Sequence, residues 1–193
     1  MAKNALNKRC VVIGGSAGSL KIVLYILAHL RPDFTIPLVI ILHRKNDDSS
    51  ILTEVLCRNS LLRVKEAEDK ETIRPATVYL APANYHLLIE KNHTFSLDAS
   101  EKVNYSRPSI DVTFQTAAEA FGSGLTGIIL SGANEDGTAG LRTIRKNKGT
   151  LIAQDPKDAY VPIMPQSAID QGLADYIMPV KGITDFLNRI ALQ

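Results

Sequence analysis

The chain has 193 residues, of which 45% are hydrophobic, and this is enough for one domain with a sizeable core. Its 22 Lys and Arg nearly balance its 20 Asp and Glu, with no long block of like charges, which gives no support for a dedicated nucleic-acid binder. The apolar runs are too short for membrane insertion, the first nine residues lack the apolar core of a signal peptide, and the two cysteines form no CxxC motif. We therefore expect a single cytoplasmic domain over residues 1–193.

Short apolar runs alternate with amphipathic segments along the chain. Uninterrupted runs predict strands buried on both faces of a parallel sheet, and apolar residues spaced by three and four predict helices. In chain order we expect a strand at Cys10–Ile13, a helix at Leu20–Leu30, a strand at Leu38–Leu42, a helix at Ile51–Arg58 capped by Ser49 or Ser50, a strand at Val78–Leu80, an antiparallel hairpin of His86–Glu90 and Thr94–Leu97, a helix with Pro108 in its first turn that runs to Phe121, a strand at Leu125–Leu130, a helix at Thr138–Lys146, a strand at Thr150–Ala153, a helix at Gln166–Gln171, a strand at Tyr176–Met178 and a C-terminal helix. This order predicts an α/β fold: a three-layer α/β/α sandwich with a mostly parallel, doubly wound sheet and one antiparallel hairpin.

Three polar residues follow three of the predicted strands. Ser16, His43 and Asp136 each come shortly after an apolar run. Because chemistry in parallel sheets gathers at the carboxyl ends of the strands, these side chains are expected to converge. Ser, His and Asp are the residues of a serine hydrolase, with Ser16 near one ring nitrogen of His43 and Asp136 near the other.

The turn after the first strand reads Gly14-Gly-Ser-Ala-Gly18. It fits the G-x-S-x-G pattern, in which a sharp strand-to-helix turn exposes a nucleophilic serine. Glycine-rich turns also bind phosphate or simply reverse the chain, so a phosphate- or nucleotide-binding module that uses Gly14–Gly18 is an alternative. A catalytically silent signalling scaffold is another.

The other two candidates also have structural interpretations. His43 is either a partly buried structural histidine or a general base. Asp136 is either the N-cap of the helix that follows it or an acid that orients His43, and these two roles are compatible. Glu135 is its neighbouring competitor.

The order Ser, His, Asp differs from that of α/β-hydrolases, and it leads to a more specific resemblance. The chain resembles the catalytic domain of the CheB family of chemotaxis receptor methylesterases from about Arg9 to Ile190. The matching motifs are Ile13-Gly-Gly-Ser-Ala-Gly18, His43, Val64–Asp69, Tyr79-Leu-Ala-Pro82 with His86, Arg107-Pro-Ser-Ile-Asp111, Ser131–Gly137 and Met164–Ile169.

The resemblance implies the chemistry. Ser16 would be the nucleophile, His43 the general base and Asp136 its orienting acid, with no metal or organic cofactor. The substrate would be a glutamate γ-methyl ester on the cytoplasmic helices of a methyl-accepting chemotaxis receptor, and the activity would extend to deamidation of receptor glutamines. The oxyanion and substrate would be bound by a further set of residues, namely Ala17, Gly18, His86, Arg107, Ala133, Asn134 and Met164.

Some features depart from the family pattern. Ala17 and Ser19 replace the usual Thr and Gly of the nucleophile turn, and Ala133 and Asn134 replace the Met and Gly before the acid. The family's N-terminal receiver domain is not expected in residues 1–193, so the chain is either a stand-alone member or an excised domain. A receiver or fused signalling domain outside these residues is a candidate partner. Arg44, Lys45 and Arg107 near the site are either ordinary surface charges or contacts for an acidic receptor helix.

Overall fold

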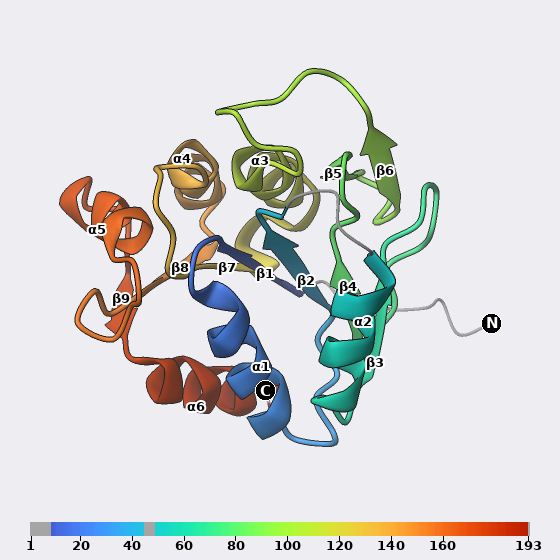
Figure 1. Ribbon diagram of the computed structural model, residues 1–193, viewed down its shortest axis with the longest axis horizontal. Coiled ribbons are helices and arrows are strands. Elements are labelled where there is room, and N and C mark those ends of the chain that lie inside the picture. Colours follow the sequence, from blue (N-terminus) through green and yellow to red (C-terminus); the bar gives the residue numbers. More distant parts are fainter. Residues whose placement is uncertain (1–8, 45–48, 193) are drawn as a thin grey trace.

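The computed structural model describes residues 9–44 and 49–192. Seven strands form one parallel sheet in the order β3-β4-β2-β1-β7-β8-β9, and the other two strands, β5 and β6, form a separate antiparallel hairpin (Figure 1). The elements are β1 (Cys10–Gly15), α1 (Ser19–His29), β2 (Leu38–Leu42), α2 (Ser49–Arg58), β3 (Arg63–Glu66), β4 (Thr77–Leu80), β5 (His86–Ile89), β6 (Phe95–Asp98), α3 (Ile110–Phe121), the 3-10 turn η1 (Gly122–Gly124), β7 (Leu125–Ile129), α4 (Thr138–Lys146), β8 (Thr150–Gln154), α5 (Ile163–Asp170), β9 (Tyr176–Met178) and α6 (Val180–Ile190).

Two apolar layers hold the sheet between its helices. On one face, alternate strand residues such as Val12 and Val39 pack with α3, α4, α5 and the hairpin. On the other face, Ile13 and Ile40 pack with α1, α2 and α6. Figure 1 shows these helices on opposite sides of the sheet. Since β1, β2 and β7 are fully buried, both faces of each central strand must be apolar, which accounts for their uninterrupted hydrophobic runs. The predicted α/β sandwich with one hairpin is confirmed.

Several predicted bounds shift by one or two residues, and the differences that bear on the site or the sheet are these. The edge strand β3 was not predicted, because its sequence Arg-Val-Lys-Glu has a single apolar residue and therefore no apolar run. Helix α3 begins at Ile110, two residues after Pro108, so Pro108 precedes the helix rather than lying in its first turn. Helix α5 begins at Ile163 instead of Gln166. The cap predicted at Ser49 or Ser50 concerns side chains outside the described set.

The strand order places the chain's reversal of direction at β1. From β1 the chain moves to β2, then to the edge strand β3 and back to β4, all on one side, whereas β7, β8 and β9 lie on the other side. Backbone hydrogen bonds join the carboxyl ends of the three central strands: His43 N donates to Gly15 O over 3.2 Å, and Ser16 N donates to Ser131 O over 2.9 Å. Parallel sheets bind ligands at such a switch point, so the segments after β1, β2 and β7 form the natural place for a site.

Candidate active site

The nucleophile turn connects β1 to α1. Ser16 follows the last residue of β1 and is partly exposed. Gly18 precedes α1 in the left-handed conformation, with φ of 83°, which glycine adopts without strain. The Ser19 N–H and hydroxyl both donate to Ser16 O, over 3.0 and 2.5 Å. Among the hydrogen bonds of the described chain, none uses the N–H of Ala17 or Gly18, so both remain available to an anion at the start of α1.

Ser131 fixes this turn from the end of β7. Its buried hydroxyl donates to Ala17 O over 2.7 Å and accepts a hydrogen bond from Val161 N over 2.8 Å. Its own N–H donates to the side chain of Gln154 over 2.9 Å. One serine therefore joins the nucleophile turn to the segment before α5, a role that the sequence analysis did not assign.

His43 and Asp136 meet at the same edge of the sheet. His43 Nε2 lies 2.7 Å from Asp136 Oδ2, and both side chains are largely buried. Since an ionised carboxylate only accepts hydrogen bonds, Nε2 is the protonated nitrogen of neutral His43, and Nδ1 keeps its lone pair. The expected approach of Asp136 to one ring nitrogen is therefore present.

The approach of Ser16 to the other nitrogen is not formed in this structure. Ser16 Oγ makes no hydrogen bond with His43, and the hydroxyl that bonds to Nδ1 is that of Ser106, at 3.4 Å. Hydrogen bonds between a nucleophile and its base often form only in the complex with substrate. The site accordingly contains an imidazole that Asp136 orients, with its Nδ1 only weakly bonded to Ser106, and Ser16 at the end of the neighbouring strand.

Asp136 is held by the start of α3. It accepts hydrogen bonds from Ser109 Oγ at 2.9 Å, Ile110 N at 2.8 Å and Asp111 N at 3.1 Å. The interpretation of Asp136 as the N-cap of the helix that follows it is wrong, because the residue before α4 is Gly137 and the carboxylate turns to a helix from another part of the chain. Although burial raises the pKa of Asp136, the hydrogen bonds from His43 and from the N-terminus of α3 outweigh it and hold the pKa below its usual value.

His86 is buried and belongs to the support of this network. Ser109 N donates to its Nδ1 over 3.2 Å, so Nε2 carries the proton and donates to Glu101 O over 2.9 Å. His86 thereby positions Ser109, which in turn binds Asp136. His86 was expected to contact substrate. Because it is buried and bonded to Ser109, it supports the residues around Asp136 instead.

Other predicted binding residues are also engaged inside the protein. Met164 is fully buried and packs against Gly132, so it cannot contact a substrate directly. Arg107 Nη1 donates to Ala99 O over 2.6 Å and Ser100 O over 2.5 Å. Arg44 pairs with Glu66. Both arginines therefore make internal contacts and also line the open cavity beside His43, so their proposed contact with a receptor helix stays a prediction. Lys45 lies outside the described residues.

Ala133 is exposed and Asn134 is partly exposed, in the segment between β7 and Asp136. Asn134 Oδ1 accepts a hydrogen bond from Asp136 N over 3.2 Å, which helps to shape this turn. Within residues 9–44 and 49–192, the His, Cys, Asp and Glu side chains form no group of three that could hold a metal ion. None of the helices in those ranges is long and apolar enough to cross a membrane.

Comparison with known proteins agrees with this geometry. The family model for the CheB methylesterase matches residues 11–187. This chain belongs to the CheB methylesterase family. Its members are carboxylic ester hydrolases, and the fold described above is that of the family's catalytic domain.

Individual relatives differ in how much of their length the chain covers. A putative protein-glutamate methylesterase/protein-glutamine glutaminase from Leptospira interrogans is 44% identical over 188 residues, which are 96% of each chain. A protein-glutamate methylesterase/protein-glutamine glutaminase from Thermotoga maritima is 37% identical, over 98% of this chain but only 56% of the relative. The crystal structure of the Thermotoga maritima CheB methylesterase catalytic domain superposes with a TM-score of 0.90 at 37% identity, covering 94% of this chain and 98% of that one.

Proposed function

We propose that this chain hydrolyses glutamate γ-methyl esters on the cytoplasmic helices of chemotaxis receptors, with Ser16, His43 and Asp136 as its catalytic residues. The observation that carries the proposal is the 2.7 Å bond between His43 and Asp136, at the strand end next to Ser16, in a chain of this family. The names of the relatives, protein-glutamate methylesterase/protein-glutamine glutaminase, support the substrate class and a second activity toward receptor glutamines. Because those receptor helices are cytoplasmic, the proposal includes a cytoplasmic location for this protein.

Acylation uses the free lone pair of His43. Nδ1 takes the proton of Ser16 as Oγ attacks the ester carbonyl carbon, and Asp136 stabilises the imidazolium that forms. The N–H groups of Ala17 and Gly18 stabilise the oxyanion of the tetrahedral intermediate. The proton then passes from Nδ1 to the departing oxygen, and methanol leaves. With a glutamine substrate, the leaving group is ammonia.

Deacylation repeats these steps with water. His43 Nδ1 takes a proton from water as its oxygen attacks the acyl carbonyl, and the proton then returns to Ser16 Oγ. The products are a glutamate side chain and the free enzyme. Family membership favours this chemistry over a phosphate-binding module and over a silent scaffold. The bond between His43 and Asp136 favours it too, because neither alternative gives that bond a role.

Methanol release from methylated receptor tests the proposal. The native protein should release methanol, whereas Ser16→Ala, His43→Ala and the double variant should be similarly inactive, because residues that act as one unit do not lose activity independently. Ser60→Ala, on a serine distant from the site in sequence, serves as the control and should retain native activity. Methanol release by Ser16→Ala near the native rate would refute the assignment of the nucleophile.

A further inference from the structure

A serine other than the proposed nucleophile lies beside His43. Since Nε2 is bonded to Asp136, Nδ1 is the nitrogen that must accept protons. Ser106 Oγ lies 3.4 Å from this atom and also 3.4 Å from Asn104 O. Both are long, weak hydrogen bonds, because hydroxyl groups usually bond over about 2.5–3.0 Å. Ser106 therefore stands beside the base without being tightly bonded to it.

The position of Ser106 is fixed by its own loop. A tight turn joins Val103 and Ser106 through two backbone hydrogen bonds, of 3.2 Å from Val103 N and 2.9 Å from Ser106 N. The two central residues of the turn, Asn104 and Tyr105, both have positive φ, of 50° and 61°. Positive φ is uncommon for tyrosine and persists where the surroundings determine the backbone. This turn is therefore a constrained one that ends in the Ser106 hydroxyl.

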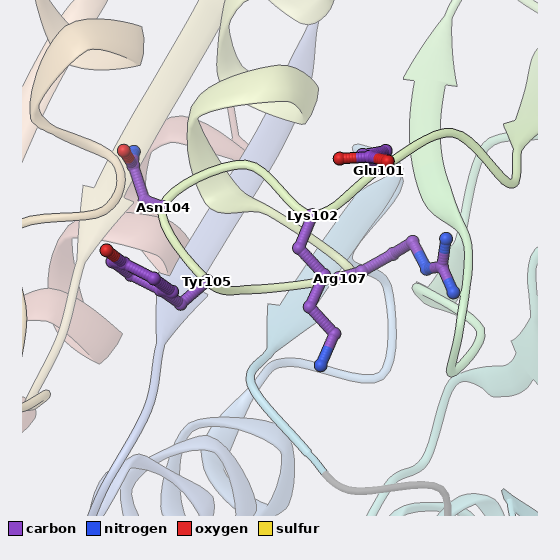
Figure 2. A pocket seen from close by; sticks show the side chains of 5 residues that line it. All are labelled: Glu101, Lys102, Asn104, Tyr105 and Arg107. Carbon is purple, nitrogen blue, oxygen red and sulfur yellow. The ribbon is translucent and has the colours of Figure 1, made fainter.

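Open space adjoins both groups. A cavity of about 430 Å³ is lined by His43 and Ser106, together with Arg44, Asn84, Lys102, Tyr105 and Arg107. Figure 2 shows the same loop from the neighbouring pocket, with Asn104 and Tyr105 on one side and Lys102 and Arg107 on the other. Water can thus reach Nδ1 beside the Ser106 hydroxyl.

We propose that Ser106 positions the water that hydrolyses the acyl-enzyme, an inference that rests on the function proposed above. Once Ser16 is acylated, its oxygen has no proton to donate, and Nδ1 must bind water instead. A water molecule that donates one hydrogen to Nδ1 can donate the other to Ser106 Oγ, because the two acceptors are 3.4 Å apart. Ser106 in turn directs its own proton to Asn104 O.

The proton balance of the step is complete. The water oxygen bonds to the acyl carbon, its first proton moves to Nδ1, and the bond from that carbon to Ser16 Oγ breaks. The proton on Nδ1 then returns to Ser16 Oγ. The second proton of the water, held by Ser106 during the attack, leaves with the glutamic acid product, which ionises in solution.

The role of Ser106 predicts a loss confined to one half of the reaction. In Ser106→Ala, rapid-quench mass spectrometry of the enzyme with a methyl ester substrate should show acylation of Ser16 at close to the native rate. Deacylation should slow by roughly 3- to 10-fold, the effect of losing one hydrogen bond. Ser106→Thr keeps a hydroxyl and should restore deacylation. The matched control is Ser100→Ala in the same loop, whose hydroxyl binds Asp98 and which should change neither step.

Other results overturn the inference. Equal slowing of acylation and deacylation in Ser106→Ala would indicate a general effect on the loop, and unchanged rates for both steps would show that Ser106 is dispensable. In either case the proposed function still holds if Ser16→Ala forms no acyl-enzyme. Acylation of Ser16→Ala at the native rate would instead refute the proposed function.

Discussion

Asp111 and Asp136 each accept hydrogen bonds from the start of a helix that is not next to them in the chain or is not their own. Asp136 precedes α4 but accepts hydrogen bonds from the start of α3, whereas Asp111 lies in the first turn of α3 and accepts one from Gly140 N, in α4, over 2.7 Å. Each carboxylate thus stabilises the N-terminus of the other's helix, where negative charge is favoured. The ionised form of Asp111 is disfavoured in this arrangement, because burial and then the charge of Asp136 raise its pKa to about 6.

This shift predicts how stability depends on pH. The pKa of Asp111 is about 6 in the folded protein and 3.8 without perturbation. Between these pH values the folded state binds more protons at this site than the unfolded state, so the contribution of Asp111 to the free energy of unfolding decreases as pH rises through that window. The pKa of Asp136 is lowered, so its contribution to the free energy of unfolding changes with pH in the opposite direction. That contribution is lost only as pH falls below 3.8 toward the folded pKa.

Asp111→Asn should therefore flatten the pH profile. The free energy of unfolding of the variant minus that of the native protein should be higher at pH 7 than at pH 4, by on the order of 2 kcal/mol. Urea denaturation at the two pH values measures this difference. Any loss from the altered hydrogen bond with Asn104 is independent of pH and cancels in this comparison. Parallel profiles for the two proteins would contradict a raised pKa at Asp111.

At the scale of elements, the turn between β1 and α1 depends on Gly18. A Cβ at this position would combine positive φ with a contact of 2.5 Å to the Cβ of Tyr160. Because the N–H groups proposed to bind the oxyanion belong to this turn, strain here should affect both stability and catalysis.

Gly18→Ala should thus lower the free energy of unfolding by about 1–3 kcal/mol and reduce kcat. Gly172→Ala is a matched control, since Gly172 has φ of 63° and open space around it. It should cost only the backbone strain, about 1 kcal/mol, and leave kcat unchanged. Equal thermal shifts for the two variants would rule out a steric contribution from Tyr160.

The sequence predicts the buried elements better than the contacts between them. Strands β2 and β9 and helix α4 match their predicted bounds, because apolar runs and helical spacing follow directly from burial. The bond between His43 and Asp136 joins residues 93 positions apart, and only the parallel sheet brings them together. No local sequence pattern predicts that the start of α3 binds Asp136. None predicts that Ser106 approaches His43. A serine before a helix was the one available signal for Ser109.

At the scale of the whole molecule, the described strands other than β5 and β6 form a single sheet, and the family match covers residues 11–187. We propose that these residues hydrolyse the ester without any activation by phosphorylation. The purified 193-residue protein should then release methanol from methylated receptor at a rate that acetyl phosphate, a small phosphodonor, does not change. A several-fold activation by acetyl phosphate, with no other protein present, would contradict this prediction.

The position of β1 at the centre of the sheet affects the order of events during biosynthesis. One side of β1 pairs with β2, which the ribosome produces soon afterwards, but the other side pairs with β7, where Cys10 lies opposite Leu125. A nascent chain therefore carries a hydrophobic strand with an open edge until β7 has emerged, and such edges can pair with other chains. Asp136 emerges later still. If Asp136 is catalytic, as proposed, we expect chains truncated before this point to be inactive and prone to aggregate.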